Sequence, residues 1–242
     1  NLLADEVRAV SDWEKVQMIK LGVRENLITT ITNGLEDEAF MDVDALASRK
    51  VKALVKNLDS YMIQIGRIYP IKNYETVIRA LPHVPTVKYL IIGQEEKSSQ
   101  YQNYKQGLIN LAKNLGVADR VIFGGVLRGV DKYYVIKHSQ LMVHMALWES
   151  FCNVVHEGMS QGRVCIVANN TALPLLIKNN VNGYTVNTKD SDELADKINF
   201  VLDPKHKNLI ENIKKRNKKI GLQDSWSHVA DRMLKLYFKG NL

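Results

Sequence analysis

The sequence predicts an α/β protein built on a Rossmann-like, doubly wound parallel sheet. From residue 60 onward, short apolar segments typical of strands alternate six times with segments that have the periodicity of helices. The apolar segments show little polar alternation, which is typical of strands covered on both faces. Glycines and charged residues follow several of these segments directly, as expected where parallel strands end at a ligand-binding edge.

Each predicted strand is short and is followed by a predicted helix. The predicted strands cover 61–65, 87–92, 121–123, 141–144, 164–167 and 184–186. The predicted helices cover 73–82, 101–115, 129–138, 153–162, 173–178 and 190–203. Asp190 has the side chain expected of a cap for the last helix. These elements indicate a domain at 33–204.

The flanking segments have a different pattern. Before the domain and at its start, the pattern predicts strands at 5–11 and 28–32, a turn at Asn33-Gly34, and helices at 12–21 and 42–57. After the domain, it predicts two helices at 205–220 and 224–239. We therefore divide the chain into the parts 1–32, 33–204 and 205–242.

The composition excludes several classes of protein. Of the 242 residues, 45% are hydrophobic and 24% charged, as in an ordinary globular protein. No apolar run reaches the roughly 18–20 residues that a membrane-spanning helix needs. Cys152 and Cys165 are too few for a disulfide framework, so we expect two free, buried thiols and a reducing, cytoplasmic location.

Much of the net charge of +7 lies late in the chain. The basic residues there are Lys205, Lys207, Lys214, Lys215, Arg216, Lys218 and Lys219. The favoured interpretation is a solvated helix face, and peripheral contact with an anionic membrane surface, such as the inner face of the membrane, is the alternative. Nucleic-acid binding is not expected, because no aromatic side chains are interleaved with the basic ones.

A first candidate site follows the first strand of the sheet, at Gly66, Arg67 and Lys72. A glycine permits a ligand to approach the backbone closely. The planar guanidinium of Arg67 and the mobile ammonium of Lys72 together suit a diphosphate. Two solvated charges on a surface loop are the simpler interpretation of the same residues.

A second candidate site runs from Glu149 to Glu157, two carboxylates with seven residues between them. Glu149 falls in a predicted loop, and Glu157 falls about one turn inside the next helix. The helix start near Asn153 offers free backbone N–H groups, which favour a bound phosphate, although a helix-dipole role explains Glu157 equally well. A third candidate, Gly124-Gly125-Val126, permits contact with a flat ring, but it is also typical of a tight turn.

Taken in order and at their spacing, these segments resemble the carboxyl-terminal domain of retaining, GT-B-fold glycosyltransferases of the large group 1 class, family four. The resemblance covers nearly the whole chain. Its segments are Ser11 to Gly34, Gly66-Arg67 with Lys72-Asn73, Leu115 to Val117 with Arg120 to Gly125, Glu149 to Glu157, Gly158 to Gly162, Asn182 to Val186, and Ser225 to Tyr237. Each motif alone is weak, but their joint order is specific.

The resemblance implies a role for each candidate residue. Arg67 and Lys72 would neutralise the diphosphate of a nucleotide sugar, Glu149 would bind a hydroxyl of the transferred sugar, and Glu157 would hold the ribose hydroxyls. The other implied donor contacts are Gly66, Phe151, Cys152, Asn153 and Val154, with Gly125 and Val126 at the nucleobase.

The implied reaction is transfer of a hexose from a nucleoside diphosphate to an acceptor hydroxyl, with retention of configuration and without a cofactor or metal. Polysaccharide or glycolipid synthesis is the implied setting. The acceptor sugar or lipid-linked glycan would bind to an amino-terminal domain, of which 1–32 would be the end. We therefore expect the isolated chain to bind nucleotide but to be inactive.

The chain departs from the family pattern at four places, none of which removes a charge that would contact phosphate. Cys152 stands where Gly or Pro is usual, Gly93-Gln94-Glu95 lacks a second glycine, Val164 replaces a frequent Pro, and Leu175 stands where Glu is common. Asp42 and Asp44 match the metal-binding Asp-x-Asp of other glycosyltransferases, but helix capping explains the pair better. The histidines show no metal-ligand spacing.

Two other functions stay open at this point. A non-catalytic nucleotide-binding subunit would pair with a separate acceptor-binding chain, and a start codon beside Asn1 would favour it over a truncated enzyme. A dinucleotide-binding oxidoreductase domain would need a Gly-x-Gly-x-x-Gly turn after a strand, and the sequence has none.

Overall fold

A computed structural model of the chain describes residues 4–84, 87–96, 101 and 103–238. At its centre is a six-stranded sheet in the order β5-β4-β3-β6-β7-β8, in which every described pairing is parallel. Its strands are β3 Tyr61–Ile65, β4 Lys88–Ile92, β5 Val121–Gly125, β6 Met142–His144, β7 Cys165–Ala168 and β8 Gly183–Val186. The strand order is that of a doubly wound sheet, so the predicted fold class is confirmed.

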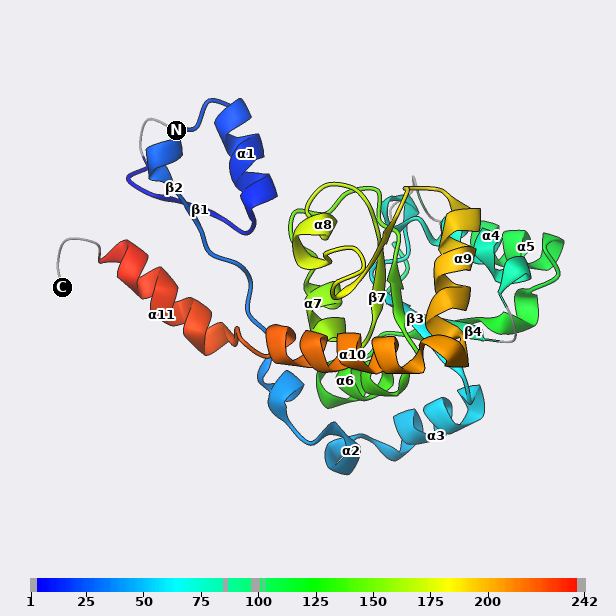
Figure 1. Ribbon diagram of the computed structural model, residues 1–242. Helices are drawn as coiled ribbons and strands as arrows, with labels where there is room; N and C mark the ends of the chain where they lie inside the picture. The colour runs from blue at the N-terminus through cyan, green and yellow to red at the C-terminus, as the bar shows by residue number, and fades with distance from the viewer. Residues whose placement is uncertain (1–3, 85–86, 97–100, 102, 239–242) are drawn as a thin grey trace.

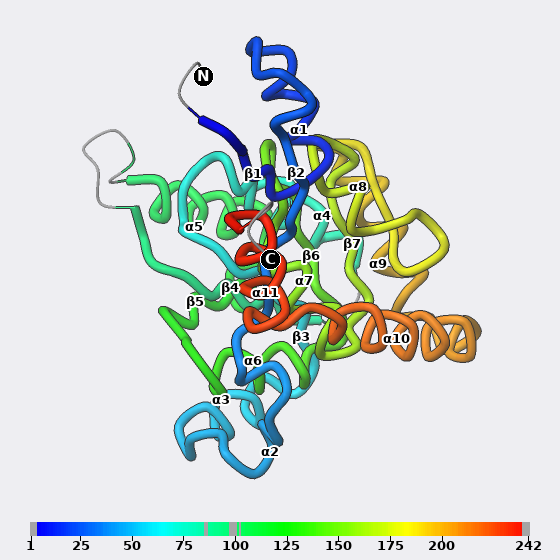
Figure 2. Tube along the Cα trace, turned by 90° about the vertical axis from the view of Figure 1, so that its left-hand side faces the viewer, coloured from blue at the N-terminus to red at the C-terminus, as the bar shows by residue number. Residues whose placement is uncertain are grey.

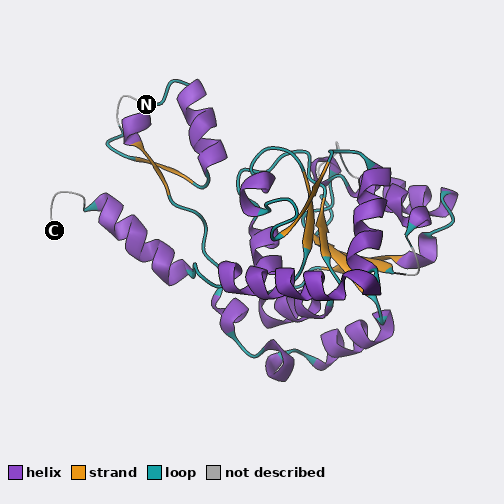
Figure 3. Ribbon diagram, in the orientation of Figure 1, coloured by secondary structure: helices purple, strands orange, loops and turns teal. Residues whose placement is uncertain are grey.

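Helices cover both faces of the sheet (Figures 1 and 3). On one face, α4 Tyr74–Ala80 packs against α5 Tyr104–Asn114 and α9 Ser191–Leu202. On the other, α7 Asn153–Ser160 packs against α6 Gly129–His138 and α10 Lys207–Gly221, and α8 Leu173–Leu176 connects β7 to β8. All residues of β3, β6 and β7 are buried, as expected of strands covered on both faces.

Local signals explain where several helices begin and end. The Asp190 carboxylate accepts a hydrogen bond from the N–H of Glu193 at 2.9 Å, so its predicted capping of α9 is confirmed. The predicted helix 73–82 ends instead at Ala80 and continues as a 3-10 turn that contains Pro82. The 3-10 turns are η1 Glu25–Leu27, η2 Asp37–Phe40, η3 Pro70–Lys72, η4 Leu81–His83, η5 Ala118–Arg120 and η6 Pro204–His206.

The single helix predicted at 42–57 is wrong. The structure has two helices there, α2 Val43–Leu46 and α3 Arg49–Leu58, separated by extended residues at 47–48. The Ser48 hydroxyl caps α3 by accepting from the N–H of Val51 at 3.3 Å. Ser48 also donates to Asp131 of α6 through its N–H at 2.8 Å and its hydroxyl at 2.7 Å. This contact with a distant helix is what interrupts the helical pattern.

Of the Asp42–Asp44 pair, Asp42 caps a helix as predicted, and Asp44 has a different role. The Asp42 carboxylate accepts hydrogen bonds from the N–H groups of Asp44 and Ala45, and so it caps α2. The Asp44 carboxylate instead contacts Lys137 at 2.5 Å and His138 at 2.7 Å, both on α6. Hydrogen bonds from these two side chains hold the pKa of Asp44 below its usual value.

The amino-terminal segment forms a small unit beside the main domain (Figures 1 and 2). Strands β1 Val7–Ala9 and β2 Ile28–Thr30 pair in parallel, and α1 Asp12–Lys20 joins them; both strands are shorter than predicted. The last helix, α11 Trp226–Tyr237, packs against this unit through a cluster of Ile31, Val229, Met233 and Leu236. Residues 102 and 239 of two predicted helices lie outside the described residues.

The turn predicted at Asn33-Gly34 is also wrong. Here the chain pairs with the segment before α11: Leu35 bridges to Ser225, and the Leu35 N–H donates to the carbonyl of Asp224 at 2.9 Å. A Cβ on Gly34 would lie 2.5 Å from the backbone nitrogen of Trp226. The glycine therefore allows two backbone segments to pass close together, rather than allowing one to turn.

Both cysteines are free and buried, as predicted. In the part of the chain that the structure describes, no helix combines the length and apolar character needed to cross a membrane.

Candidate functional site

The carboxyl ends of β3 and β6 lie side by side at the point where the strand order reverses. In doubly wound sheets, ligands bind in the crevice at this point. A cavity of about 250 Å³ opens there. Among its lining residues are Gly66, Arg67, Lys72, Glu149, Cys152, Asn153 and Val154, all of which the sequence predicts as site residues.

Backbone contacts hold the loop after β3 in place. The Gly66 carbonyl accepts a hydrogen bond from the Tyr74 hydroxyl at 2.9 Å. That carbonyl passes so close to Gly93, after β4, that a Cβ at Gly93 would lie 1.8 Å from its oxygen. On the other side, the N–H of Leu147 donates to the carbonyl of Ile71 at 2.7 Å, which joins this loop to the one after β6. The two loops that carry Lys72 and Glu149 are therefore held against each other.

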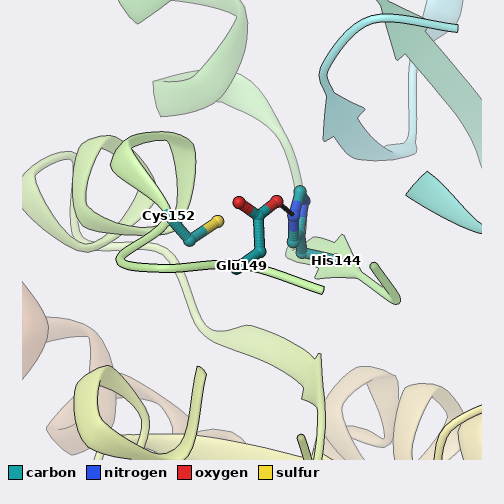
Figure 4. Close-up of side chains that lie close together, drawn as sticks. All are labelled: His144, Glu149 and Cys152. Atoms are coloured by element: carbon teal, nitrogen blue, oxygen red, sulfur yellow. Dashed lines mark hydrogen bonds and ion pairs between the residues drawn. The ribbon is translucent and has the colours of Figure 1, made fainter. Parts of the chain in front are cut away.

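Lys72, His144 and Glu149 form a charged cluster at the cavity wall. The Lys72 ammonium and Nε2 of His144, the latter at 2.7 Å, both contact Oε1 of Glu149. Figure 4 shows the His144 ring directed at this carboxylate. Because a carboxylate only accepts hydrogen bonds, the proton of a neutral His144 must be on Nε2. The Glu149 carboxylate is thus oriented by two donors before any ligand arrives.

The charges of this cluster follow from burial and pairing. Burial lowers the pKa of His144, which outweighs the opposite effect of the neighbouring Glu149 carboxylate. Burial would raise the pKa of Glu149, but the hydrogen bond from His144 and the charge of Lys72 outweigh it and leave that pKa below its usual value. At neutral pH, Glu149 is therefore a carboxylate and His144 is neutral.

Cys152 lies close to the same carboxylate (Figure 4). Donor atoms of His144, Glu149 and Cys152 lie within 4.8 Å of one another, and donors of these types suit a transition-metal ion. Two features disfavour a metal here. The Lys72 ammonium already contacts the Glu149 oxygen, and burial raises the pKa of the Cys152 thiol well above its usual value, so the thiolate is unfavourable.

The start of α7 forms another part of the cavity wall. Its N-cap residue, Cys152, has a φ of 82°, in the left-handed region that favours glycine. Asn153 and Val154, the first two residues of α7, line the cavity. The first N–H groups of a helix lack intrahelical partners and lie at its positive end, so this wall favours an anion.

Arg67 is the exposed cation of the cavity. Its side chain is 66% exposed, in contrast to 16% for Lys72. It pairs with Glu96 at 3.4 Å and lies over the ring of Tyr69, with 5.0 Å from the guanidinium carbon to the ring centroid. An ion pair this exposed contributes little to stability. The guanidinium can therefore turn toward a ligand at small cost.

The remaining predicted site residues lie outside this cavity. Gly125 and Val126 line a second, larger cavity of about 600 Å³ between β5 and α3. The N–H of Gly93 donates to the carbonyl of Gly125 at 2.8 Å, which links the two regions. The Phe151 side chain is buried beside His156, with 5.7 Å between ring centroids, and lines a different cavity. Glu157 is buried on α7, where its Oε1 accepts from Lys132 at 3.0 Å.

Sequence reasoning gave no site role to two residues that contact the predicted carboxylates. These residues are His144, which contacts Glu149, and Lys132, which contacts Glu157. The sequence does indicate that Lys132 lies on the buried face of its helix. It precedes Val135 and Ile136 by three and four residues, and both of these are buried. A lysine on the buried face of a helix needs an oppositely charged partner, so its position indicates a carboxylate nearby.

Comparison with known proteins places the chain in a family. Residues 48–219 match the family described as glycosyl transferases group 1. The D-inositol 3-phosphate glycosyltransferase of Mycolicibacterium smegmatis is 27% identical over 235 residues, which are 97% of this chain and 52% of that protein. Its counterpart in Mycobacterium bovis is 27% identical over 201 residues, 82% of this chain and 41% of that protein. The chain thus spans about half the length of the curated relatives it matches.

Solved structures show the same fold. The Anabaena protein Alr3699/HepE, in complex with UDP and glucose, matches with a TM-score of 0.85 and 22% identity, over 99% of this chain and 64% of that one. A glycosyltransferase from Rickettsia africae matches with a TM-score of 0.85 and 20% identity, over 98% of this chain and 64% of that one. With the family match over most of its length, the chain belongs to the group 1 glycosyltransferases and has the α/β fold of their GT-B structures.

Proposed function

We propose that this chain is the donor-binding half of a retaining hexosyltransferase and that it binds a nucleoside-diphosphate sugar in the 250 Å³ cavity. The observation that carries the proposal is the meeting of Arg67, the Lys72–Glu149 pair and the start of α7 at the reversal of strand order. The similar fold of HepE, solved with UDP and glucose, supports a donor of this chemical class.

The proposed mechanism uses positive groups of the protein in place of a metal. As the bond between sugar and diphosphate breaks, negative charge grows on the departing phosphate. Lys72 and the first N–H groups of α7 are held in place before the ligand arrives, and Arg67 turns toward the diphosphate when it binds. Together these groups stabilise that charge. Glu149, held by His144, accepts a hydrogen bond from a hydroxyl of the sugar. No cofactor and no metal is needed in this scheme.

We expect the isolated chain to bind one of the nucleoside diphosphates UDP, GDP and ADP, and to bind NAD far more weakly. The cavity holds two cations that suit a diphosphate, and no Gly-x-Gly-x-x-Gly turn is present for a dinucleotide. Titration calorimetry with the four compounds, with and without EDTA, measures this. An affinity that depends on a divalent ion would contradict the metal-free scheme, and preferential binding of NAD would overturn the assignment.

We also expect little sugar transfer by the purified chain, because the proposed acceptor, a sugar or lipid-linked glycan, would bind to an amino-terminal domain. Residues 1–32 would be the end of that domain, and α11, which packs on Ile31, would cross back to it. Robust transfer by the chain alone would contradict this expectation. Transfer that appears only when a separate acceptor-binding chain is added would favour the alternative, a nucleotide-binding subunit.

A contact with a cytoplasmic membrane face is a further part of the proposal. Lys207, Lys215, Lys218 and Lys219 are exposed on α10, and on another face of the same helix Leu209 and Ile220 are 45% and 39% exposed. A cluster of exposed lysines on one helix face favours an anionic lipid surface. Sedimentation of the chain with anionic but not with neutral vesicles would support this contact. Failure to sediment with anionic vesicles would contradict it.

A further inference from the structure

A buried lysine links Glu157 to the segment that leads into the domain. The Lys132 side chain, on α6, is only 11% exposed. Its ammonium contacts Oε1 of Glu157 at 3.0 Å and Oε2 of Glu36 at 2.8 Å. Burying a charge is costly unless it is paired and hydrogen-bonded. The fold nevertheless places this cation directly against Glu157, which the proposed function assigns to nucleotide binding.

Glu157 has one oxygen satisfied and one unsatisfied. The residue is 8% exposed, and its Oε1 accepts from Lys132. Its Oε2 is buried and accepts no hydrogen bond within the described residues. Glu157 lies four residues after Asn153 and three after Val154, which line the cavity, so the three lie on one face of α7. A ligand hydroxyl that enters along this face would supply the missing donor.

We propose that Lys132 is a positioning residue, which holds Glu157 by Oε1 so that Oε2 is left to accept a hydroxyl of the bound nucleotide. This inference rests on the proposed function. Glu36 is the second carboxylate that contacts the Lys132 ammonium. It follows Leu35, which pairs with Ser225 where the chain returns toward α11, so it approaches Lys132 from a fixed backbone position.

The charge of Lys132 also affects the pKa of Glu157. Burial raises the pKa of Glu157, the ammonium of Lys132 opposes that rise, and the carboxylate of Glu36 adds to it. A protonated Glu157 loses its negative charge and one of its accepting oxygens. Nucleotide binding through Glu157 is therefore lost as the pH falls through the pKa of this group. A variant without Lys132 raises that pKa further, so binding is lost at a higher pH than in the wild type.

The test compares two substitutions that shift the pKa of Glu157 in opposite directions. The probe is whichever of UDP, GDP and ADP binds the wild-type chain, titrated by calorimetry from about pH 5.5 to about pH 8.5. Lys132→Met is expected to bind about tenfold more weakly near neutral pH, with the difference narrowing as the pH rises. Glu36→Gln removes a negative charge at a half-exposed position and is expected to retain binding to a lower pH than the wild type.

Controls separate positioning from general damage to the fold. Lys132→Arg keeps the charge and should restore most of the wild-type pH profile. In the Glu157→Gln background, Lys132→Met should change the affinity little further, because its partner is gone. Lys137→Met, on the same helix and paired with the distant Asp44, should bind like the wild type. Carboxyl carbon NMR of Glu157 reports its pKa without any nucleotide, and it should rise in Lys132→Met and fall in Glu36→Gln.

The outcomes distinguish this inference from the proposed function. If the wild type binds a nucleotide and both Lys132→Met and Glu36→Gln keep its pH profile, the positioning role is wrong and the proposed function stands. If Lys132→Met weakens binding equally in the Glu157→Gln background, Lys132 does not act through Glu157. If the wild type binds none of the three diphosphates, the proposed function fails, and this inference fails with it.

Discussion

Replacing Arg67 with alanine is expected to weaken binding of a nucleoside diphosphate by about tenfold to a hundredfold. A hydrogen bond from a cation to a phosphate contributes about 1.5–3 kcal/mol, and every 1.4 kcal/mol is about tenfold in affinity. The Arg67 side chain is 66% exposed and its partner in the free protein is Glu96, at 3.4 Å. The substitution should therefore leave the fold intact and affect the ligand alone. Calorimetry measures the affinity, and thermal unfolding checks the fold.

The matched control is Arg79→Ala, because Arg79 is an exposed arginine on α4 that does not line the cavity. Its affinity for the nucleotide should equal that of the wild type. Arg67→Lys should fall between the two, since it keeps the charge but loses the planar fork that suits a diphosphate. Unchanged affinity in Arg67→Ala would show that this residue does not contact the phosphates.

Replacing Gly93 with alanine is expected to destabilise the domain by about 3 kcal/mol or more. The new Cβ would lie 1.8 Å from the carbonyl oxygen of Gly66, and the clash is with backbone rather than with a flexible side chain. Gly66 has little room to move, because its N–H donates to Ile92 at 2.9 Å and its carbonyl accepts from Tyr74. Chemical denaturation measures the loss of unfolding free energy.

The same change at Gly107 is the control, since a Cβ there meets nothing within 4 Å. Gly107 lies within α5, where alanine is favoured over glycine by about 0.5–1 kcal/mol, so Gly107→Ala should be slightly stabilising. The two variants should thus change stability in opposite directions. A Gly93→Ala protein as stable as the wild type would mean that the loops after β3 and β4 are not packed as closely as described.

The elements of the sheet were predictable because their signal is local. The apolar runs at 61–65 and 87–92 and the helical periodicity at 129–138 agree with β3, β4 and α6 to within a residue. The two wrong predictions lie where distant residues intervene. Asp131 binds Ser48 and interrupts the helix expected at 42–57, and the start of α11 passes against Gly34 where a turn was expected.

The residue types of the candidate site were also predictable, but their pairings were not. The sequence places Arg67 and Lys72 after one strand and Glu149 after another, and parallel strands bring such loops to one edge. It contains no signal that Lys72 and His144 contact one oxygen of Glu149, since these residues are 77 and 5 positions away from it. The sequence likewise could not predict that Gly125 and Val126 line a second cavity, apart from Arg67, Lys72 and Glu149.

The sequence by itself determined the order of strands and helices along the chain, the α/β class and the candidate cations and carboxylates, because periodicity and residue type act over a few neighbouring residues. Only the tertiary structure decided which charges meet. Whether Lys72 neutralises Glu149, and whether Lys132 holds Glu157, depends on how strands and helices distant in the sequence pack together. Burial then strengthens those pairings, since charges removed from water interact more strongly with one another and unpaired ones are costly.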